Sequence, residues 1–403
     1  MKRLAGILVL LMLAAPAWAA RKITVGQLED LLHSMRQAKK TDAEVATELK
    51  QIELSEELTR TAMNSLVNYV PGPLSTEQIY VLEARSADLA PQASDLPAIP
   101  APDAAAQRAI LDKAETYVTR TYEQLPLLTA TKATLRFQDN VEAVAASSGV
   151  VGSATEMGAS SRFSNPASFV HYISSTETTV VSEHGAEKLP SEKDKTPWGA
   201  NKMIALQEPD PSLGVILQEA QAAGSIQWLR WELVNGKQAA VYSFAVPIKK
   251  SRLAVNVCCF PNVSQAGIAR FYTPMSAAQI GGAEAAGGGA GGVAGNFQTN
   301  TNWHNYKAGV PYHGELFINP DTGIVVRMIT EAELKPSEVV HQVDTRIDYG
   351  PVKVGARMLV VPVRTVINTE VVPGGDSGAS GYSTRRTLFT SEYKDYQPAG
   401  VAH

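Results

Sequence analysis

Strand–turn–strand patterns recur in the C-terminal half of the sequence, and the clearest of them spans Tyr312–Thr330. In its first arm, apolar or small side chains at every second position alternate with His313, Glu315 and Phe317, which is the period of a β-strand. The turn Asn319–Gly323 supplies the fixed φ of proline and the positive φ open to glycine, so the chain can reverse there. A hairpin alone is not stable in water and needs further strands or a helix over its apolar face. The sequence therefore predicts a larger sheet around this hairpin.

Similar patterns lie on both sides of this hairpin. Asn235-Gly236, between two apolar runs, is a strong signal for a tight hairpin turn. Strands are predicted at 131–137, 168–175, 178–182, 228–234, 239–246, 252–260, 339–349, 353–367 and 384–393. Helices do not separate these strands at the regular spacing of βαβ units, so the sequence favours mostly antiparallel pairing.

The region 20–89, by contrast, is predicted to be helical. Thr24–Gln27, Thr41–Glu44 and Ser75–Gln78 each have the spacing of a capping box, in which the first and fourth residues satisfy each other's backbone groups. Residues 90–102 are rich in proline and alanine, which is typical of a semi-rigid linker.

Two further helices are predicted within the β-rich region. Asp103 can cap a helix that runs to about Gln124 and is long enough to cover a sheet. Asp210-Pro211 can begin a shorter helix that Gly224 ends.

The predicted fold class is α+β: a curved, mostly antiparallel sheet resembling half a barrel, with covering helices, preceded by the small helical region. Residues 103–403 form the β-rich domain in this interpretation. Segments 145–166 and 281–302 are rich in glycine, serine and alanine, and we expect flexible insertions there.

The first 19 residues of the 403-residue chain have the pattern of a secretory signal peptide. Lys2 and Arg3 precede an apolar run, and the small-residue triplet Ala17-Trp18-Ala19 predicts cleavage near Ala19. The run is too short for a membrane span of about 20 residues, and no later stretch is long enough. We therefore expect an exported protein, periplasmic or secreted, with no transmembrane segment in the mature chain. Its negative net charge makes nucleic acid an unsuitable partner.

The two cysteines, Cys258 and Cys259, are neighbours in a predicted strand. Adjacent cysteines can form a disulfide only through a strained local ring. Three interpretations remain open: buried thiols, a vicinal disulfide, or bonds to another chain. In each of them, no framework of disulfides holds this fold.

No motif in the sequence predicts a catalytic, metal or cofactor site. HExxH, GxSxG and the Walker loop are absent. Gly375-Asp376-Ser377-Gly378 resembles the serine loop of trypsin-like proteases, but the histidine setting of that family is missing, so a flexible loop is the simpler interpretation.

The charged residues on the predicted strands are expected to be ordinary surface groups. His313, Glu315 and Arg327 have the spacing of a solvated strand face. Asp344 and Asp348 share a strand face, and without a pocket around them they are expected to be surface acids.

Aromatic residues on the strands are the best candidates for an apolar binding surface. Most such residues form core, but a curved sheet with a helix in its hollow can also enclose a lipid or acyl ligand. The candidates for a ligand-facing position are Trp228, Trp231, Tyr242, Phe244, Tyr312 and Phe317.

The succession WLRWELVNGKQAAVYSFAVP, YHGELFINPDTGIVVRMI and RIDYGPVKVGARMLVVPVRTVI resembles the exported half-barrel proteins of the LolA and RseB lipoprotein-carrier type. The resemblance covers roughly Ile226 to Tyr393 and includes no diagnostic binding residue. It implies a curved antiparallel sheet with helices on its concave side, which holds an acyl chain or senses envelope lipids. The helical N-terminal region and the glycine-rich insertion depart from that pattern.

Three functions remain open at this point. The first is a noncatalytic exported protein that binds a hydrophobic ligand or an envelope component in the half-barrel. The second is a module that binds another envelope protein and has no cavity. The third is a hydrolase whose site is assembled from residues far apart in the sequence.

Overall fold

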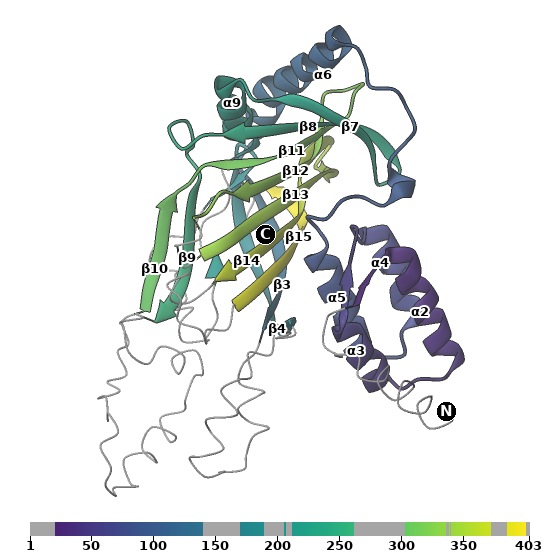
Figure 1. The fold of residues 1–403 in the computed structure, drawn as a ribbon. Coiled ribbons are helices and arrows are strands. Elements are labelled where there is room, and N and C mark those ends of the chain that lie inside the picture. The colour runs from purple at the N-terminus through teal and green to yellow at the C-terminus, as the bar shows by residue number, and fades with distance from the viewer. Residues whose placement is uncertain are drawn as a thin grey trace, which may run out of the picture.

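The structure of the chain is a computed structural model that describes residues 21–139, 170–188, 205–206, 212–261, 303–335, 338, 340–371 and 385–399. The predicted signal peptide, both predicted insertions and the loop around Ser377 lie outside the described residues. Figure 1 shows a small helical unit beside a large twisted sheet, with further helices on the sheet. The fold is therefore α+β, with a large open antiparallel sheet as predicted.

The helical unit is formed by residues 21–90. Its elements are β1 (Arg21–Ile23), α2 (Val25–Gln37), α3 (Asp42–Lys50), β2 (Ile52–Leu54), α4 (Arg60–Leu66), the 3-10 turn η1 (Val67–Tyr69) and α5 (Pro73–Arg85). The two short strands pair in parallel. Buried leucine, isoleucine, valine and methionine side chains from all of these helices form one core, which includes Leu28, Leu32, Val45, Met63 and Ile79.

Capping explains where these helices begin. Thr24 and Thr41 form the two capping boxes that the sequence predicts. The third predicted box, at Ser75, is wrong: α5 begins at Pro73, and the carboxylate of Asp42 accepts hydrogen bonds from the amides of Leu74 and Ser75. An acid from α3 therefore satisfies the start of α5 and ties the two helices together.

The segment 91–127 crosses from the helical unit to the sheet. It contains the 3-10 turn η2 (Ala93–Asp95), α6 (Ala104–Tyr117) and the single π-turn η3 (Val118–Tyr122). Asp103 caps α6 as predicted. The hydroxyl of Tyr242 donates a hydrogen bond to the carbonyl of Gln107 over 2.8 Å, which fixes α6 on the sheet.

The main sheet has ten strands in the order β5-β4-β3-β15-β14-β13-β12-β11-β8-β7, and all neighbours are antiparallel. The strands are β3 (Leu128–Asp139), β4 (Val170–Glu183), β5 (Ala186–Glu187), β7 (Gln227–Val234), β8 (Lys237–Val246), β11 (Tyr312–Ile318), β12 (Val325–Ala332), β13 (Val340–Val354), β14 (Arg357–Val371) and β15 (Arg385–Pro398). The predicted hairpin at 312–330 is β11–β12, well inside the sheet, and Asn235-Gly236 turns β7 into β8 with both residues at positive φ.

A second sheet and a helix complete the β-rich region. The strands β6 (Ala205–Leu206), β9 (Ala254–Pro261) and β10 (Trp303–Gly309) pair in the order β10-β9-β6. The helix α9 (Leu213–Ala223) ends at Gly224 as predicted, but Ser212 caps it rather than Asp210. The strands β9 and β10 extend away from α9, as Figure 1 shows.

One face of the main sheet, here called the core face, is covered by α6, η3 and α9. Buried side chains of these three elements, such as Ile110, Tyr122 and Ile216, form one cluster with Leu316 and Met328 of the hairpin. The opposite face, here called the docking face, is turned toward the helical unit.

The hairpin turn and α6 touch at Gly323, and this contact can be tested. Gly323 has φ +74°, and a Cβ there would lie 2.4 Å from the backbone carbon of Lys113. We expect Gly323→Ala to lower the free energy of unfolding by about 2–4 kcal/mol, because backbone strain and a backbone clash add. Gly236→Ala is the matched control, since Gly236 has φ +72° and open space, and it should cost about 1 kcal/mol. Equal losses in urea unfolding would contradict the close contact.

Candidate functional site

The docking face carries a row of charged residues across three neighbouring strands. Arg327 on β12 lies opposite Asp348 on β13, and Asp348 lies opposite Arg364 on β14. Arg346 precedes Asp348 by two residues and therefore points to the same face. Strand pairing thus places three guanidinium groups around one carboxylate.

Asp348 is the centre of this group. Its carboxylate oxygens lie 2.7 Å from Arg327 Nε, 3.4 Å from Arg346 Nε and 3.7 Å from an Nη of Arg364. Burial alone would raise the pKa of Asp348, but Arg346, Arg327 and Arg364 outweigh it and hold the pKa well below its usual range. Asp348 is therefore ionised throughout the physiological pH range.

Further negative charge comes from Glu232 of β7, which lies 3.7 Å from Arg327, and from the helical unit. Glu57 Oε1 lies 2.6 Å from Arg346 Nη1, and its Oε2 lies 3.4 Å from Arg327 Nη1. Glu83 of α5 lies 2.5 Å from Arg364 Nη2. We call the three arginines, Asp348, Glu57 and Glu83 the docking network.

The docking network is largely buried. The Arg346 and Glu57 side chains are 3% and 5% exposed, and Arg346 also donates to the carbonyl of Ala87 over 3.0 Å. Burial raises the pKa of Glu83, although Arg364 beside it acts in the opposite direction. Charges buried this deeply are tolerated only when they are paired and hydrogen-bonded.

Apolar and polar contacts surround the docking network. Val81, Ala84 and Ala87 of the helical unit pack against a group on the sheet that includes Val366 and Leu388. At the rim, Arg60 pairs with Glu392, and Glu77 accepts a hydrogen bond from the amide of Tyr172 over 3.0 Å. The helical unit is therefore held on the docking face by an apolar patch with a buried ionic centre.

A second group of acids lies on the docking face beside this centre. Burial, together with the charge of Asp88, raises the pKa of Asp344 to about 8. Burial likewise raises the pKa of Asp88 to about 6. Gln342 donates a hydrogen bond to Asp344. Asp344 therefore carries a proton at neutral pH.

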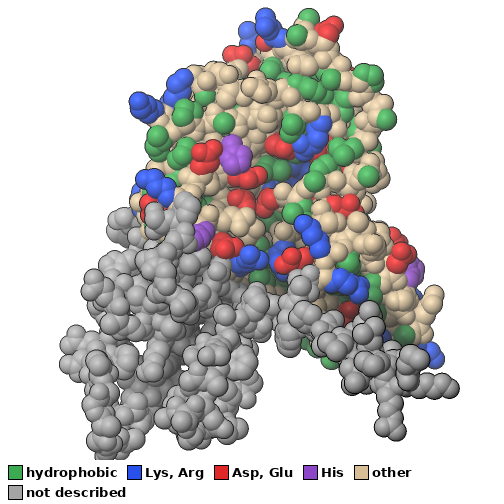
Figure 2. All heavy atoms as spheres, viewed as in Figure 1, with side chains coloured by type: hydrophobic (Ala, Val, Ile, Leu, Met, Phe, Trp, Pro, Cys, Tyr) green, Lys and Arg blue, Asp and Glu red, His purple; other side chains and the backbone are tan. Residues whose placement is uncertain are grey.

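These findings correct two sequence predictions. Arg327, Asp344 and Asp348 are not solvated, because the helical unit covers the part of the sheet where they lie. His313 is half exposed, as predicted, and lies 3.2 Å from Glu331. Figure 2 shows His, Asp and Glu side chains gathered on the visible face of the sheet.

The structure gathers five of the six predicted ligand-facing residues on the core face. Tyr242, Phe244 and Tyr312 are buried in the cluster under α6 and α9, and Trp228 and Trp231 pack against that cluster. The Phe244 and Tyr312 rings lie 6.0 Å apart, and the two tryptophan rings 4.8 Å apart.

Phe317, the sixth, lies on the docking face. Its ring centre is 5.2 Å from the guanidinium carbon of Arg327 and 5.8 Å from that of Arg230. It therefore belongs to the surroundings of the docking network, where the arginines stack on its ring.

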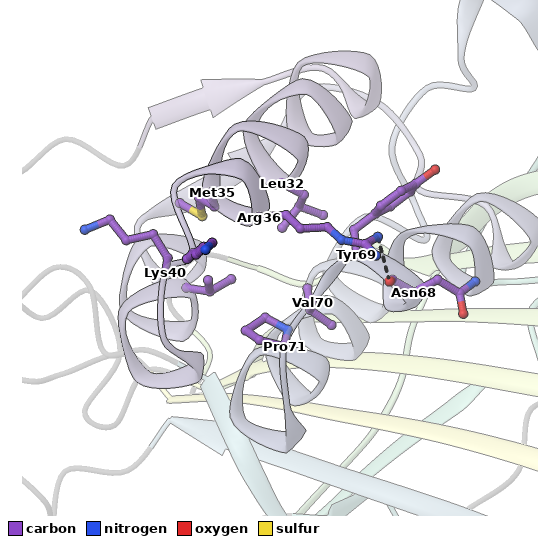
Figure 3. A pocket seen from close by; sticks show the side chains of 10 residues that line it. Leu32, Met35, Arg36, Lys40, Asn68, Tyr69, Val70 and Pro71 are labelled. Atoms are coloured by element: carbon purple, nitrogen blue, oxygen red, sulfur yellow. Dashed lines mark hydrogen bonds between the residues drawn. The ribbon is translucent and has the colours of Figure 1, made fainter.

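Two hollows stand out in the described part of the chain, and neither lies under α6 or α9. One of about 390 Å³ is in the helical unit (Figure 3), and one of about 180 Å³ lies between Arg85 and strands β13–β15. Among the described residues, no group of three or more His, Cys, Asp or Glu side chains can hold a metal ion. Cys258 and Cys259 lie in β9, and their side chains are outside the described part of the structure.

Comparison with models of protein families, with curated proteins and with solved structures found no match. In the described ranges, no helix is long and apolar enough to cross a membrane. The geometry of the chain is therefore the basis for proposing a function.

The docking network can be tested by removing one guanidinium group. We expect Arg346→Met to lower the free energy of unfolding by about 3–5 kcal/mol, because Glu57 would lose its shorter ion pair and Asp348 one of its three guanidinium groups while both acids stay buried. Arg21→Met is the matched control: Arg21 pairs with Glu48 at the surface, and its loss should change stability by less than about 1 kcal/mol. Chemical unfolding of both variants compares the two losses, and a small effect of Arg346→Met would show that the ionic centre is hydrated.

The acid beside the network predicts a dependence on pH. The pKa of Asp344 is about 8 in the folded protein, against about 3.9 in an unfolded chain. Between these values the folded protein holds a proton that the unfolded chain has released, so this group makes stability fall as pH rises. Asp344→Asn stays neutral at every pH, so between about pH 5 and pH 9 its free energy of unfolding should fall by about 4 kcal/mol less than that of the wild type. Parallel stability curves of the two proteins would argue against a protonated Asp344.

Proposed function

We propose that this protein is a noncatalytic exported interaction module, in which the sheet and the docked helical unit together bind another protein. The pKa values of Arg346 and Asp348 are strongly shifted because these two groups pair with one another and with neighbouring charges on the docking face, which is the pattern of a structural ion network. This supports a structural role for the described charged cluster rather than a role in acid–base chemistry.

The filled core face supports binding of a protein over carriage of a ligand. In the resemblance to lipoprotein carriers, an acyl chain lies between the sheet and its helices. Here Tyr122, Tyr242 and Ile216 are buried in that space, in contact with one continuous cluster. An acyl chain would have to displace side chains that stabilise the fold.

An exposed apolar strip at the β7 edge of the sheet is the observation that carries the proposal. Leu229 of β7 is 44% exposed, and Leu96 and Ile99 of the segment beside it are 42% and 46% exposed. The indole of Trp231 donates a hydrogen bond to the carbonyl of Pro100 over 3.0 Å, which holds this segment along β7. Figure 2 shows hydrophobic side chains gathered on this side of the molecule. Exposed apolar side chains on neighbouring segments are typical of protein-binding surfaces.

A hydrophobic-ligand carrier is the second candidate function. The half-buried Trp228 and Trp231, at the border between the core cluster and the β7 edge, favour it. If the protein is a carrier, native mass spectrometry of protein purified from its own envelope should detect a co-purifying lipid. The carrier function does not require a protein partner at the apolar strip.

The proposal is tested at the apolar strip. A photo-crosslinking residue at position 229 should give a discrete crosslink to a protein, and the same residue at position 358 should not. Met358, which is 63% exposed on β14, is the control because it is apolar, more exposed and lies outside the strip. With the crosslinked protein in purified form, Leu229→Asp should weaken binding at least about tenfold, because an apolar anchor is lost, and Met358→Asp should leave it unchanged. Equal effects at both positions would reject the strip as the binding surface.

A further inference from the structure

The turn after α2 contains a lysine where helices usually have glycine. The amide of Lys39 donates to the carbonyl of Arg36, and the amide of Lys40 donates to the carbonyl of Met35, both over 3.1 Å. This is a Schellman motif, and its left-handed residue is Lys39, with φ +53°.

A lysine is an unfavourable choice for this backbone conformation. Glycine adopts positive φ without strain, and in this chain Gly224 follows α9 at φ +67°. Cations do favour the C-terminus of a helix, but Arg36 and Lys40 already flank this end of α2. Strained residues that persist in a fold are concentrated at functional sites. The side chain of Lys39 therefore calls for a role beyond the turn.

Lys39 is one of the residues that line the 390 Å³ hollow, which lies between the end of α2, α3 and residues 68–71 (Figure 3). The deepest side chains are Leu32 and Val45, which are buried in the core of the helical unit. Met35, Val70 and Pro71 also line it. One side of the hollow is therefore apolar.

Two cations that line the hollow, Arg36 and Lys39, have no acid partner among the described residues. Arg36 donates to the carbonyl of Asn68 over 3.5 Å and lies 5.9 Å from the centre of the Tyr69 ring. Neither Arg36 nor Lys39 is within ion-pair distance of a described carboxylate, whereas Lys40 pairs with Glu44 over 2.6 Å. The hollow thus combines apolar walls with positive charge that the helical unit itself does not neutralise.

We propose that this hollow binds a single-chain amphiphile with an anionic headgroup. The alkyl chain would lie on Met35, Val70 and Pro71, with the buried Leu32 and Val45 beneath it, and the headgroup would lie between Arg36 and Lys39. The volume is within the range of small-molecule sites, about 300–1,000 Å³. A carboxylate and a phosphate headgroup have the chemistry that these two cations recognise. The proposal does not depend on the apolar strip at β7.

The test uses the full mature chain and dodecanoate below its micelle concentration. We expect saturable binding by calorimetry, with NMR shifts centred on the methyl groups of Leu32 and Val45. A second titration uses lysophosphatidylglycerol, which has a phosphate headgroup in place of the carboxylate. The amphiphile that binds more tightly shows whether the site prefers a phospholipid or a free fatty acid. Dodecanol, which lacks the charge, should bind at least about fivefold more weakly.

Lys39→Gly separates the proposed role from a structural one. The variant removes strain, so its thermal midpoint should stay equal or rise by about 1–3 °C, while dodecanoate binding weakens by about three- to tenfold. Lys50→Gln removes a positive charge elsewhere in the helical unit and should leave the affinity unchanged. Each of three results would overturn the proposal. The Lys39→Gly variant could bind dodecanoate as tightly as the wild type, the NMR shifts could fall outside the methyl groups of Leu32 and Val45, or dodecanol could bind as tightly as dodecanoate.

Discussion

Neutralisation of three buried arginines is the constraint on which the arrangement of this protein depends. Arg327, Arg346 and Arg364 come from adjacent strands, and Asp348 alone cannot balance them. Glu57 and Glu83 of the helical unit, together with Glu232 of β7, supply the further negative charge. Without the helical unit, the charged face would be open to water, and the unit's two acids would lose their partners. The helical unit is therefore part of the sheet structure and not a free arm.

The docking network determines where the helical unit sits more than how tightly it is held. The cost of desolvating a buried ion pair offsets most of the attraction between its charges. Such pairs therefore add little stability, but they disfavour any position of the helical unit in which the charges are not paired. The apolar contact of Val81, Ala84 and Ala87 with the sheet supplies the favourable burial. A shift of one residue in the pairing of β13 would turn Arg346 and Asp348 to the core face. The register of β13, and with it the position of the helical unit on the sheet, is therefore well specified.

Local signals in the sequence predicted much of the fold, and the site was missed for a physical reason. The β11–β12 hairpin, the Asn235-Gly236 turn and the capping boxes at Thr24 and Thr41 depend on nearby residues, and the structure has them. Periodicity places Arg327 on a strand face but does not say what covers that face. Its partner Glu57 lies 270 residues away in the sequence. The sequence did contain one signal: an arginine recurs on the same face of three successive predicted strands. Burying these arginines costs solvation free energy unless acids lie over them.

The residues that the fold does not need are the best guide to function. The aromatic side chains of the core face are engaged with α6 and α9, and the charges of the docking network are engaged with one another. Leu229, by contrast, exposes an apolar side chain, and Lys39 adopts a strained backbone conformation that glycine would adopt freely. Neither feature stabilises the chain on its own. Since stability does not explain them, the β7 edge and the end of α2 are the places where a partner or a ligand would account for the sequence.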